Sequence, residues 1–194
     1  DFLIGVIGSL EDCKTVKEDI KNYLKEALKL ELSDEKTLIT NAQKPAKFLG
    51  FDIFIRRSND LRKDKNGRTV RSLGHVPVLY LNYETMRKKL FDYKAARIAA
   101  ENGKEIWKSI VRTYMIDLDD LEIVSQFNAE IRGFYNYYSI ANNSPAINSF
   151  YHIMSYSMYK TFARKYKSSV KKILFQYKKD GTFKVAYENS KGKT

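Results

Sequence analysis

Five basic side chains recur at helical spacing near the C-terminal end of the sequence, where together they could bind a row of phosphates. At about 100° of rotation per residue they share a stripe roughly 60° wide, and apolar and tyrosine side chains occupy another face of the same predicted helix. A ladder of cations suits a nucleic-acid backbone, and a solvated helix face is the alternative. The five residues are Lys160, Arg164, Lys167, Lys171 and Lys178.

A dense aromatic run precedes this helix. Four of the five residues from 134 to 138 are aromatic, so their rings point around the whole helix and cannot all enter a core. Phe134 and Tyr138 fit the apolar stripe, whereas Tyr135 or Tyr137 must face a partner helix or a ligand. Exposed rings could stack on unpaired bases, and helix packing with hydrogen-bonded hydroxyls is an equal alternative.

A polar loop in the first half of the chain is also strongly basic. We favour contact with backbone phosphates as its role, and a solvated hairpin tip as the alternative. Its basic residues are Arg56, Arg57, Arg62, Lys63, Lys65, Arg68 and Arg71.

The chain has 194 residues and a net charge of +12, which is segregated along the sequence. Residues 51–100 carry +7 and residues 151–194 carry +9, whereas residues 1–50 and 101–150 carry −1 and −3. A polyanionic partner explains such clusters, because neutralising phosphates releases condensed counterions. We therefore favour nucleic acid over a membrane surface, and an ordinary basic protein is the remaining interpretation.

The residues that usually perform metal or covalent chemistry are scarce. The single cysteine, Cys13, excludes a disulfide framework, and together with His75 and His152 it cannot complete a zinc site of the usual kind. Neither histidine has the partner that nucleophilic catalysis needs. The hydrophobic fraction of 43% excludes a disordered chain. No apolar run approaches the about 18 residues that span a bilayer, and no signal peptide is visible.

Secondary-structure signals divide the chain near residue 83 and predict the α+β class. Before this point we expect a strand over 2–8, a helix from a Ser9 cap to about residue 30, and strands over 48–56, 69–73 and 76–82. After it we expect an all-helical region. Its predicted parts are a helix over 84–102, a short helix or turn over 105–115, a helix that begins with a capping box at Asp119 and Glu122, and a helix over 146–179 that Ser168 and Ser169 could divide.

Several of these segments resemble motifs of reverse transcriptases. Residues 1–5, Asp-Phe-Leu-Ile-Gly, resemble the sequence that follows the Tyr-Ala-Asp-Asp turn, residues 33–37 resemble a motif near the end of the palm, and residues 48–51 resemble the primer-grip hairpin. Residues 132–138, Arg-Gly-Phe-Tyr-Asn-Tyr-Tyr, resemble the Arg-Gly-x-x-Asn-Tyr-Tyr signature of the maturase, or X, domain in group II intron-encoded proteins. Residues 161–167 resemble the end of that domain, so the resemblance covers nearly the whole chain.

The resemblance implies the C-terminal part of a polymerase palm over residues 1–82, where a helix packs on short antiparallel strands. It implies a three-helix thumb, or maturase domain, over residues 83–180 and a polar tail over residues 181–194. The expected RNA-binding residues are the five cations of the stripe, together with Arg56, Arg57, Arg62 and Lys63 of the basic loop and Arg132, Tyr135, Asn136 and Tyr137 of the aromatic segment.

The chemistry implied by the resemblance is nucleotidyl transfer with two Mg²⁺ ions. Asp1 would be the second aspartate of the turn, which makes it the expected catalytic residue and metal ligand. The primer end would be held by Phe48, Leu49, Gly50 and Phe51, although a buried structural hairpin explains the same residues. The chain begins without a methionine, and we interpret it as a fragment that cannot assemble the catalytic site by itself.

The implied function is that of a group II intron-encoded RNA-directed DNA polymerase and maturase. Its expected partners are the intron RNA and an RNA template with its DNA primer, with a homodimer as a further candidate and no membrane. We expect it in a bacterial cytoplasm, or alternatively in an organelle. An RNA-binding splicing cofactor without polymerase activity is the alternative function.

Overall fold

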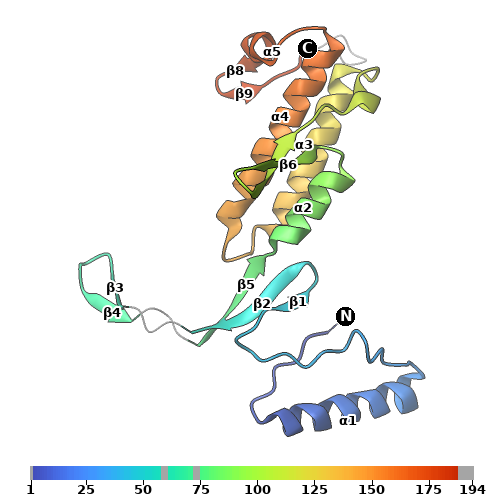
Figure 1. Cartoon of the computed structure of the whole chain (residues 1–194), viewed down its shortest axis with the longest axis vertical. Coiled ribbons are helices and arrows are strands. Elements are labelled where there is room, and N and C mark those ends of the chain that lie inside the picture. The colour runs from blue at the N-terminus through green and yellow to red at the C-terminus, as the bar shows by residue number, and fades with distance from the viewer. Residues whose placement is uncertain (1, 58–60, 72–74, 188–194) are drawn as a thin grey trace. The chain divides into compact units, whose positions relative to one another are not determined.

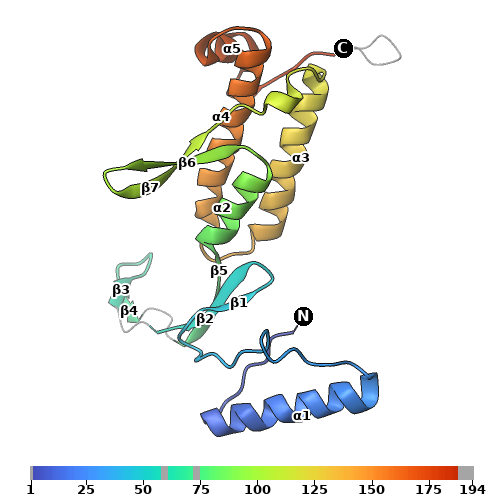
Figure 2. The ribbon, with the colours of Figure 1, turned by 45° about the vertical axis from the view of Figure 1, so that its right-hand side comes forward.

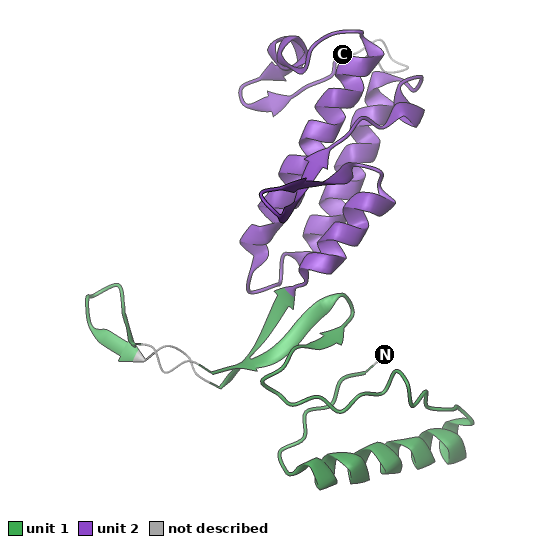
Figure 3. Cartoon of the chain, in the orientation of Figure 1, with its two compact units in different colours: residues 1–80 green, residues 81–194 purple. Residues whose placement is uncertain are grey.

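The computed structural model of the chain describes residues 2–57, 61–71 and 75–187 (Figures 1 and 2). The chain divides into two compact units, residues 1–80 and residues 81–194 (Figure 3). The structure is a mixture of helices and short antiparallel strands, in agreement with the predicted α+β class. No helix among the described residues is both long enough and apolar enough to cross a membrane.

The first unit contains one helix, α1 (Leu10–Leu28), which confirms the helix predicted from Ser9 onward. The Ser9 hydroxyl accepts a hydrogen bond from the Asp12 backbone N–H at 3.2 Å, and the Asp12 carboxylate accepts one from the Ser9 N–H at 2.7 Å. These reciprocal bonds form a capping box and hold the pKa of Asp12 below its ordinary value. Lys29, with a φ of 55°, ends the helix.

A three-stranded sheet of the first unit has the order β1 (Ala46–Phe48), β2 (Phe51–Arg56) and β5 (Val76–Leu81). The strand predicted over 48–56 is confirmed from Phe51 to Arg56 but not before, because the chain reverses at Leu49 and Gly50 with φ values of 50° and 81°. Two positive φ values in a two-residue turn match the right-handed twist of antiparallel strands. A second hairpin, β3 (Leu61–Lys63) with β4 (Thr69–Arg71), lies in the loop that was predicted to be basic and polar.

The strand predicted over residues 2–8 is absent from the described structure. The pattern of apolar residues is that of a buried strand, yet Phe2, Leu3 and Ile4 are exposed and no described segment pairs with them. An apolar run becomes a strand only when a neighbour accepts its backbone hydrogen bonds.

The second unit is built on two long helices that pack side by side, α3 (Asp120–Tyr138) and α4 (Ile147–Lys165). The predicted capping box is confirmed, since Asp119 and Glu122 bond to each other's backbone N–H groups. A short 3-10 helix, η2 (Ser144–Ala146), joins the two long helices. The rings of Phe134 and Phe150 stack across the interface with centroids 3.9 Å apart.

The helix predicted over 84–102 is confirmed only as far as Asp92. The helix α2 (Tyr83–Asp92) ends early, and an antiparallel hairpin follows it, formed by β6 (Ala96–Glu101) and β7 (Lys104–Ser109). Asn102 and Gly103 form its turn with φ values of 51° and 72°. The prediction took this Asn-Gly pair as a helix stop, although Asn-Gly between strands is among the strongest hairpin signals. The helix or turn expected over 105–115 is likewise a strand, followed by a 3-10 helix, η1 (Thr113–Met115).

The last predicted helix is divided, as the two serines suggested. After α4 the chain turns and starts α5 (Val170–Tyr177), where the Ser169 hydroxyl accepts a hydrogen bond from the Lys172 N–H. A small hairpin follows, β8 (Lys178–Lys179) with β9 (Thr182–Phe183). The ring of Phe183 stacks on Tyr177, with centroids 5.3 Å apart, so the beginning of the expected polar tail packs into this end of the unit. The second unit is thus not all-helical.

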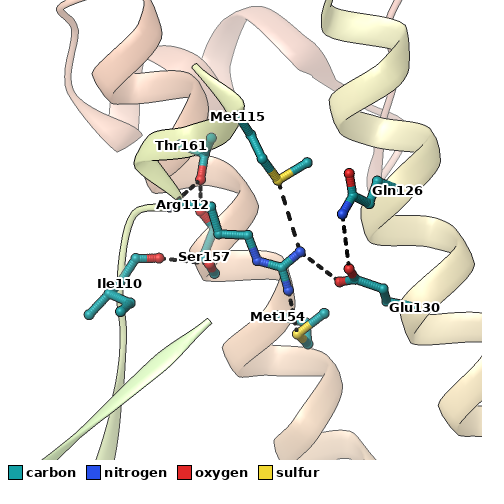
Figure 4. A network of polar contacts seen from close by, with 8 residues as sticks. All are labelled: Ile110, Arg112, Met115, Gln126, Glu130, Met154, Ser157 and Thr161. Carbon is teal, nitrogen blue, oxygen red and sulfur yellow. Dashed lines mark hydrogen bonds and ion pairs between the residues drawn. The ribbon is translucent and has the colours of Figure 1, made fainter. Parts of the chain in front are cut away.

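One charged side chain, Arg112, lies in the centre of the second unit (Figure 4). Its backbone N–H donates a hydrogen bond to the Thr161 hydroxyl at 3.1 Å, and its guanidinium lies over the ring of Phe127. The guanidinium also contacts the sulfur atoms of Met115 and Met154. The segment after β7 is therefore attached to both long helices by one residue that the sequence pattern did not single out.

Candidate nucleic-acid interface

A groove of about 810 Å³ lies where α4 ends and α5 begins, and we call it the basic groove. Four cations and one carboxylate are among the residues that line it. The lining residues are Val111, Ile116, Asp117, Lys160, Ala163, Arg164, Lys165, Lys167, Ser168 and Val170. Three of the five cations predicted to form a phosphate ladder therefore line the same groove.

Two cations of the basic groove are held by the protein itself. Lys160 Nζ donates a hydrogen bond to the Ser109 carbonyl oxygen at 2.7 Å. Lys165 Nζ contacts the Leu118 carbonyl at 2.6 Å and Asp120 Oδ1 at 2.7 Å. Because these contacts attach α4 to β7 and to the start of α3, both lysines support the walls of the groove as well as its charge.

The other two cations, Arg164 and Lys167, are exposed. Among the residues that the structure describes, neither side chain forms an ion pair. Lys167 has a φ of 47°, and its N–H bonds to the Arg164 carbonyl while the Ser168 N–H bonds to the Ala163 carbonyl. This is a Schellman motif, the common way in which a helix ends. The end of α4 thus presents to one groove two exposed cations that form no ion pair within the described residues.

The prediction of one straight cationic stripe is wrong in its geometry. Lys171 lies on α5 and Lys178 on β8, beyond the Schellman turn, and neither lines the basic groove. Both side chains are exposed. Their role in RNA binding, and that of the three cations in the groove, stays a prediction.

Asp120, at the start of α3, bonds to the C-terminal ends of both α4 and α5. Besides Lys165, its carboxylate accepts hydrogen bonds at Oδ2 from the Tyr166 hydroxyl at 2.6 Å and from the Tyr177 hydroxyl at 3.3 Å. Burial, followed by the hydrogen bond to Asp120, raises the pKa of Tyr166 well above its ordinary value. The phenol therefore stays protonated and donates to the carboxylate, and the bond from Tyr177 holds α5 against the start of α3.

A second groove, of about 360 Å³, lies between α3 and α4, and we call it the tyrosine groove. Two residues of the predicted RNA-binding motif, Arg132 and Tyr135, line it. Its lining residues are Asn128, Ile131, Arg132, Tyr135, Ile147, Asn148 and Tyr151. The three residues from α4 carried no signal in the sequence, because only the packing of the two helices places them beside the motif.

The remaining residues of the motif divide as the helical pattern predicted. Phe134 and Tyr138 are buried in the core, whereas Asn136 and Tyr137 are exposed and line neither groove. The ring of Tyr137 contacts that of Tyr138 edge to face at 4.8 Å. Of the two exposed tyrosines of the motif, Tyr135 is thus the one that lines a groove.

The predicted site residues of the first unit lie on its two hairpins. Phe51 is buried at the start of β2 while Leu49 is exposed in the turn, with Phe48 before it and Gly50 after it. Of the basic residues, Arg56 ends β2, Arg57 follows it, and Arg62 and Lys63 are exposed on β3. The hairpin shape is present, and the primer-grip and phosphate-binding roles stay predictions.

The expected metal ligand, Asp1, lies outside the described residues. Within residues 2–57, 61–71 and 75–187, no group of three or more His, Cys, Asp or Glu side chains is placed to hold a metal ion.

Comparison with known proteins identifies the family. The model of the type II intron maturase family matches residues 82–192, which is more than half of the chain. The chain belongs to the type II intron maturase family. The matched region contains both grooves, so the candidate interface lies in the part of the chain that defines a type II intron maturase.

Relatives of this chain extend the similarity to the first unit. Group II intron-encoded protein LtrA of Lactococcus lactis subsp. cremoris is 39% identical over 194 residues, which is all of this chain and 32% of LtrA. The putative COX1/OXI3 intron 1 protein of Saccharomyces cerevisiae is 34% identical over 173 residues, 86% of this chain and 20% of that protein. The chain spans about a third or less of the length of these relatives.

Proposed function

We propose that this chain binds group II intron RNA and assists its splicing, with the basic groove as the main contact to the RNA backbone. The observation that carries the proposal is the pair of exposed cations, Arg164 and Lys167, at the end of α4 within the family-defining region. Folded RNA offers closely spaced phosphates, and cations that form no ion pair within the described residues can neutralise them without first losing one.

We further propose that the complete protein is an RNA-directed DNA polymerase that uses Mg²⁺ and binds a template with its primer. The support is the resemblance of the first unit to the end of a polymerase palm, together with a match to LtrA that continues through residues 1–81. Asp1 and the hairpin at Leu49 and Gly50 would then belong to the polymerase site. A splicing cofactor without polymerase activity remains the second candidate, and a homodimer remains a candidate assembly.

The place of action that we propose is a bacterial cytoplasm, with an organelle as the alternative. Relatives come from a bacterium, Lactococcus lactis, and from a yeast.

The experiment that tests the maturase proposal measures affinity for a group II intron RNA across a salt series. The double variant Arg164→Gln/Lys167→Gln removes two cations and keeps side chains of similar length. We expect weaker binding and a slope of log affinity against log salt that is shallower by about 1–2, because each lost phosphate contact removes about 0.7–0.9 from the slope.

The matched control is Lys14→Gln/Lys25→Gln, which removes the same charge from exposed positions on α1. Net charge alone would affect both double variants equally, whereas a phosphate contact affects only the first. An unchanged salt slope in the Arg164→Gln/Lys167→Gln protein would refute the basic groove as the RNA contact.

A further inference from the structure

The tyrosine groove has a different chemistry from the basic groove. Tyr135 on α3 and Tyr151 on α4 are each 55% exposed. In the described part of the chain, neither ring stacks on another aromatic ring. Large exposed rings without a stacking partner are costly to hydrate and are well suited to a flat, unpaired nucleobase.

Polar side chains complete the groove between these two rings. Asn128 and Asn148 each offer an amide with both a donor and an acceptor, which is what the edge of a base requires. Arg132 is exposed, and among the described residues its guanidinium has no carboxylate partner. No acidic residue lines the groove. The groove therefore combines apolar and aromatic surface with two amides and one cation, and no acidic side chain in its lining would repel a phosphate.

Helical spacing places these side chains on one face of α3 and one face of α4. Asn128, Arg132 and Tyr135 follow one another by four and three residues on α3, so they share a face. Asn148 and Tyr151 are three residues apart on α4 and share the face opposite. The volume of about 360 Å³ lies in the range of about 300–1,000 Å³ that is usual for small-ligand sites.

We propose that the tyrosine groove binds one unpaired base of the RNA. In this site Tyr135 and Tyr151 stack on the base, Asn128 and Asn148 hydrogen-bond to its edge, and Arg132 contacts the adjoining phosphate. The proposal rests on the RNA binding proposed above and adds a second, chemically distinct site. A docking helix from a protein partner fits less well, because Ile131 and Ile147 are the only aliphatic residues that line the groove, whereas two amides and an arginine line it as well.

The test uses two RNA probes, a short oligoadenylate that contains a single 2-aminopurine and a blunt RNA duplex. We expect the oligoadenylate to bind with quenching of the 2-aminopurine fluorescence, because the base stacks on a tyrosine ring. Tyr135→Ala and Tyr151→Ala should each weaken this binding about tenfold, in line with the loss of one base–aromatic stack. Affinity for the duplex, whose bases are all paired, should stay unchanged.

Two kinds of control separate stacking from structural damage. Tyr135→Phe and Tyr151→Phe keep the ring and should keep both the affinity and the quenching. Tyr23→Ala removes an equally large exposed ring from α1, outside the groove, and should have no effect. Circular dichroism of every variant, compared with the parent protein, checks that the helices are retained.

The outcomes distinguish this proposal from the one on which it rests. Loss of oligoadenylate binding in the alanine variants, with full binding in the phenylalanine variants, supports the base site. Equal binding by the alanine variants and the parent overturns the base site, while a weakened Arg164→Gln/Lys167→Gln protein would still support RNA binding by the basic groove. An equal loss of duplex and oligoadenylate binding in the alanine variants also overturns it, since unpaired bases would not be what the rings recognise.

Discussion

Nη1 of Arg112 lies 2.6 Å from Oε2 of Glu130, and this ion pair is almost completely enclosed by the second unit (Figure 4). The Arg112 side chain is 0% exposed and that of Glu130 is 15% exposed. The other neighbours of the guanidinium are the rings of Phe127 and Tyr93 and two methionine sulfur atoms, all of which are weak partners for a cation. Glu130 is thus the principal compensation for a buried positive charge.

The first prediction concerns this charge. Glu130→Gln keeps the shape of the side chain and leaves the guanidinium of Arg112 buried without a counter-charge. We expect the free energy of unfolding to fall by about 3–5 kcal/mol, which urea unfolding followed by circular dichroism can measure. The double variant Arg112→Met/Glu130→Leu should recover most of this loss, because it removes both charges from the interior.

A surface ion pair supplies the control. Arg87 Nε lies 2.8 Å from Glu105 Oε1, but the two side chains are 39% and 38% exposed. Glu105→Gln should therefore cost no more than about 1 kcal/mol. If Glu105→Gln and Glu130→Gln were equally costly, burial would not be the reason why the Arg112 pair matters.

The second prediction concerns the single acid of the basic groove. Asp117 is exposed and lines the groove together with Lys160, Arg164, Lys165 and Lys167. A carboxylate near bound phosphates repels them, so Asp117→Asn should strengthen binding of group II intron RNA, by about two- to fivefold at low salt. The gain should shrink as salt is added. Weaker binding by the Asp117→Asn protein in a filter-binding titration would show that the acid has another role, such as positioning the RNA.

The third prediction is a pH dependence that comes from Tyr166. Burial and the hydrogen bond to Asp120 raise the pKa of this phenol in the folded state above the ordinary value of about 10. Above that pH the unfolded chain loses the proton while the folded chain keeps it, so the unfolded state binds fewer protons and stability falls as pH rises. The contribution is complete below about pH 10 and is lost progressively above it.

Tyr166→Phe removes this titrating group. Between about pH 9 and 11, the free energy of unfolding of the Tyr166→Phe protein should fall less steeply than that of the parent. Asp120→Asn, which removes the carboxylate that accepts the hydrogen bond, should also reduce the steepness. Identical slopes for the parent and for Tyr166→Phe in urea unfolding would show that the phenol is not held by Asp120 in solution.

Local signals in the sequence account for part of this architecture. The Ser9 cap and the capping box at Asp119 predict the starts of α1 and α3, because the bonds that cap a helix connect residues only two or three apart. The buried positions of Phe134 and Tyr138 follow from helical periodicity. The division of the last helix at Ser168 and Ser169 was also visible, since serine is a favoured cap.

The features that were not predicted depend on contacts between distant residues. The pairing of β6 with β7 forms a hairpin where the end of a helix was expected, although the Asn102-Gly103 turn signal was present in the sequence. The tyrosine groove needs Tyr151 of α4 beside Tyr135 of α3, and no local pattern connects them. The sequence pattern did not single out Arg112, because its burial depends on Glu130 eighteen residues later and on Met154 further along.

The fourth prediction separates stability from RNA binding at a single residue, Lys167. This lysine has a φ of 47° at the position of the Schellman motif where glycine is usual, and a side chain there strains the backbone by about 1 kcal/mol. Lys167→Gly relieves that strain and removes an exposed cation from the basic groove. We expect the free energy of unfolding to rise by up to about 1 kcal/mol while affinity for group II intron RNA falls.

Lys167→Asn is the companion variant, because asparagine tolerates the left-handed conformation and also lacks the positive charge. Both variants should lose affinity to a similar extent and should flatten the salt dependence by about 0.7–0.9 in slope, the value for one phosphate contact. A rise in stability together with unchanged affinity would mean that Lys167 serves only to end α4. If Lys167→Gly instead lowered both the free energy of unfolding and the affinity, the aliphatic chain of Lys167 would be packing against the groove. The lost affinity would then reflect lost packing rather than lost charge.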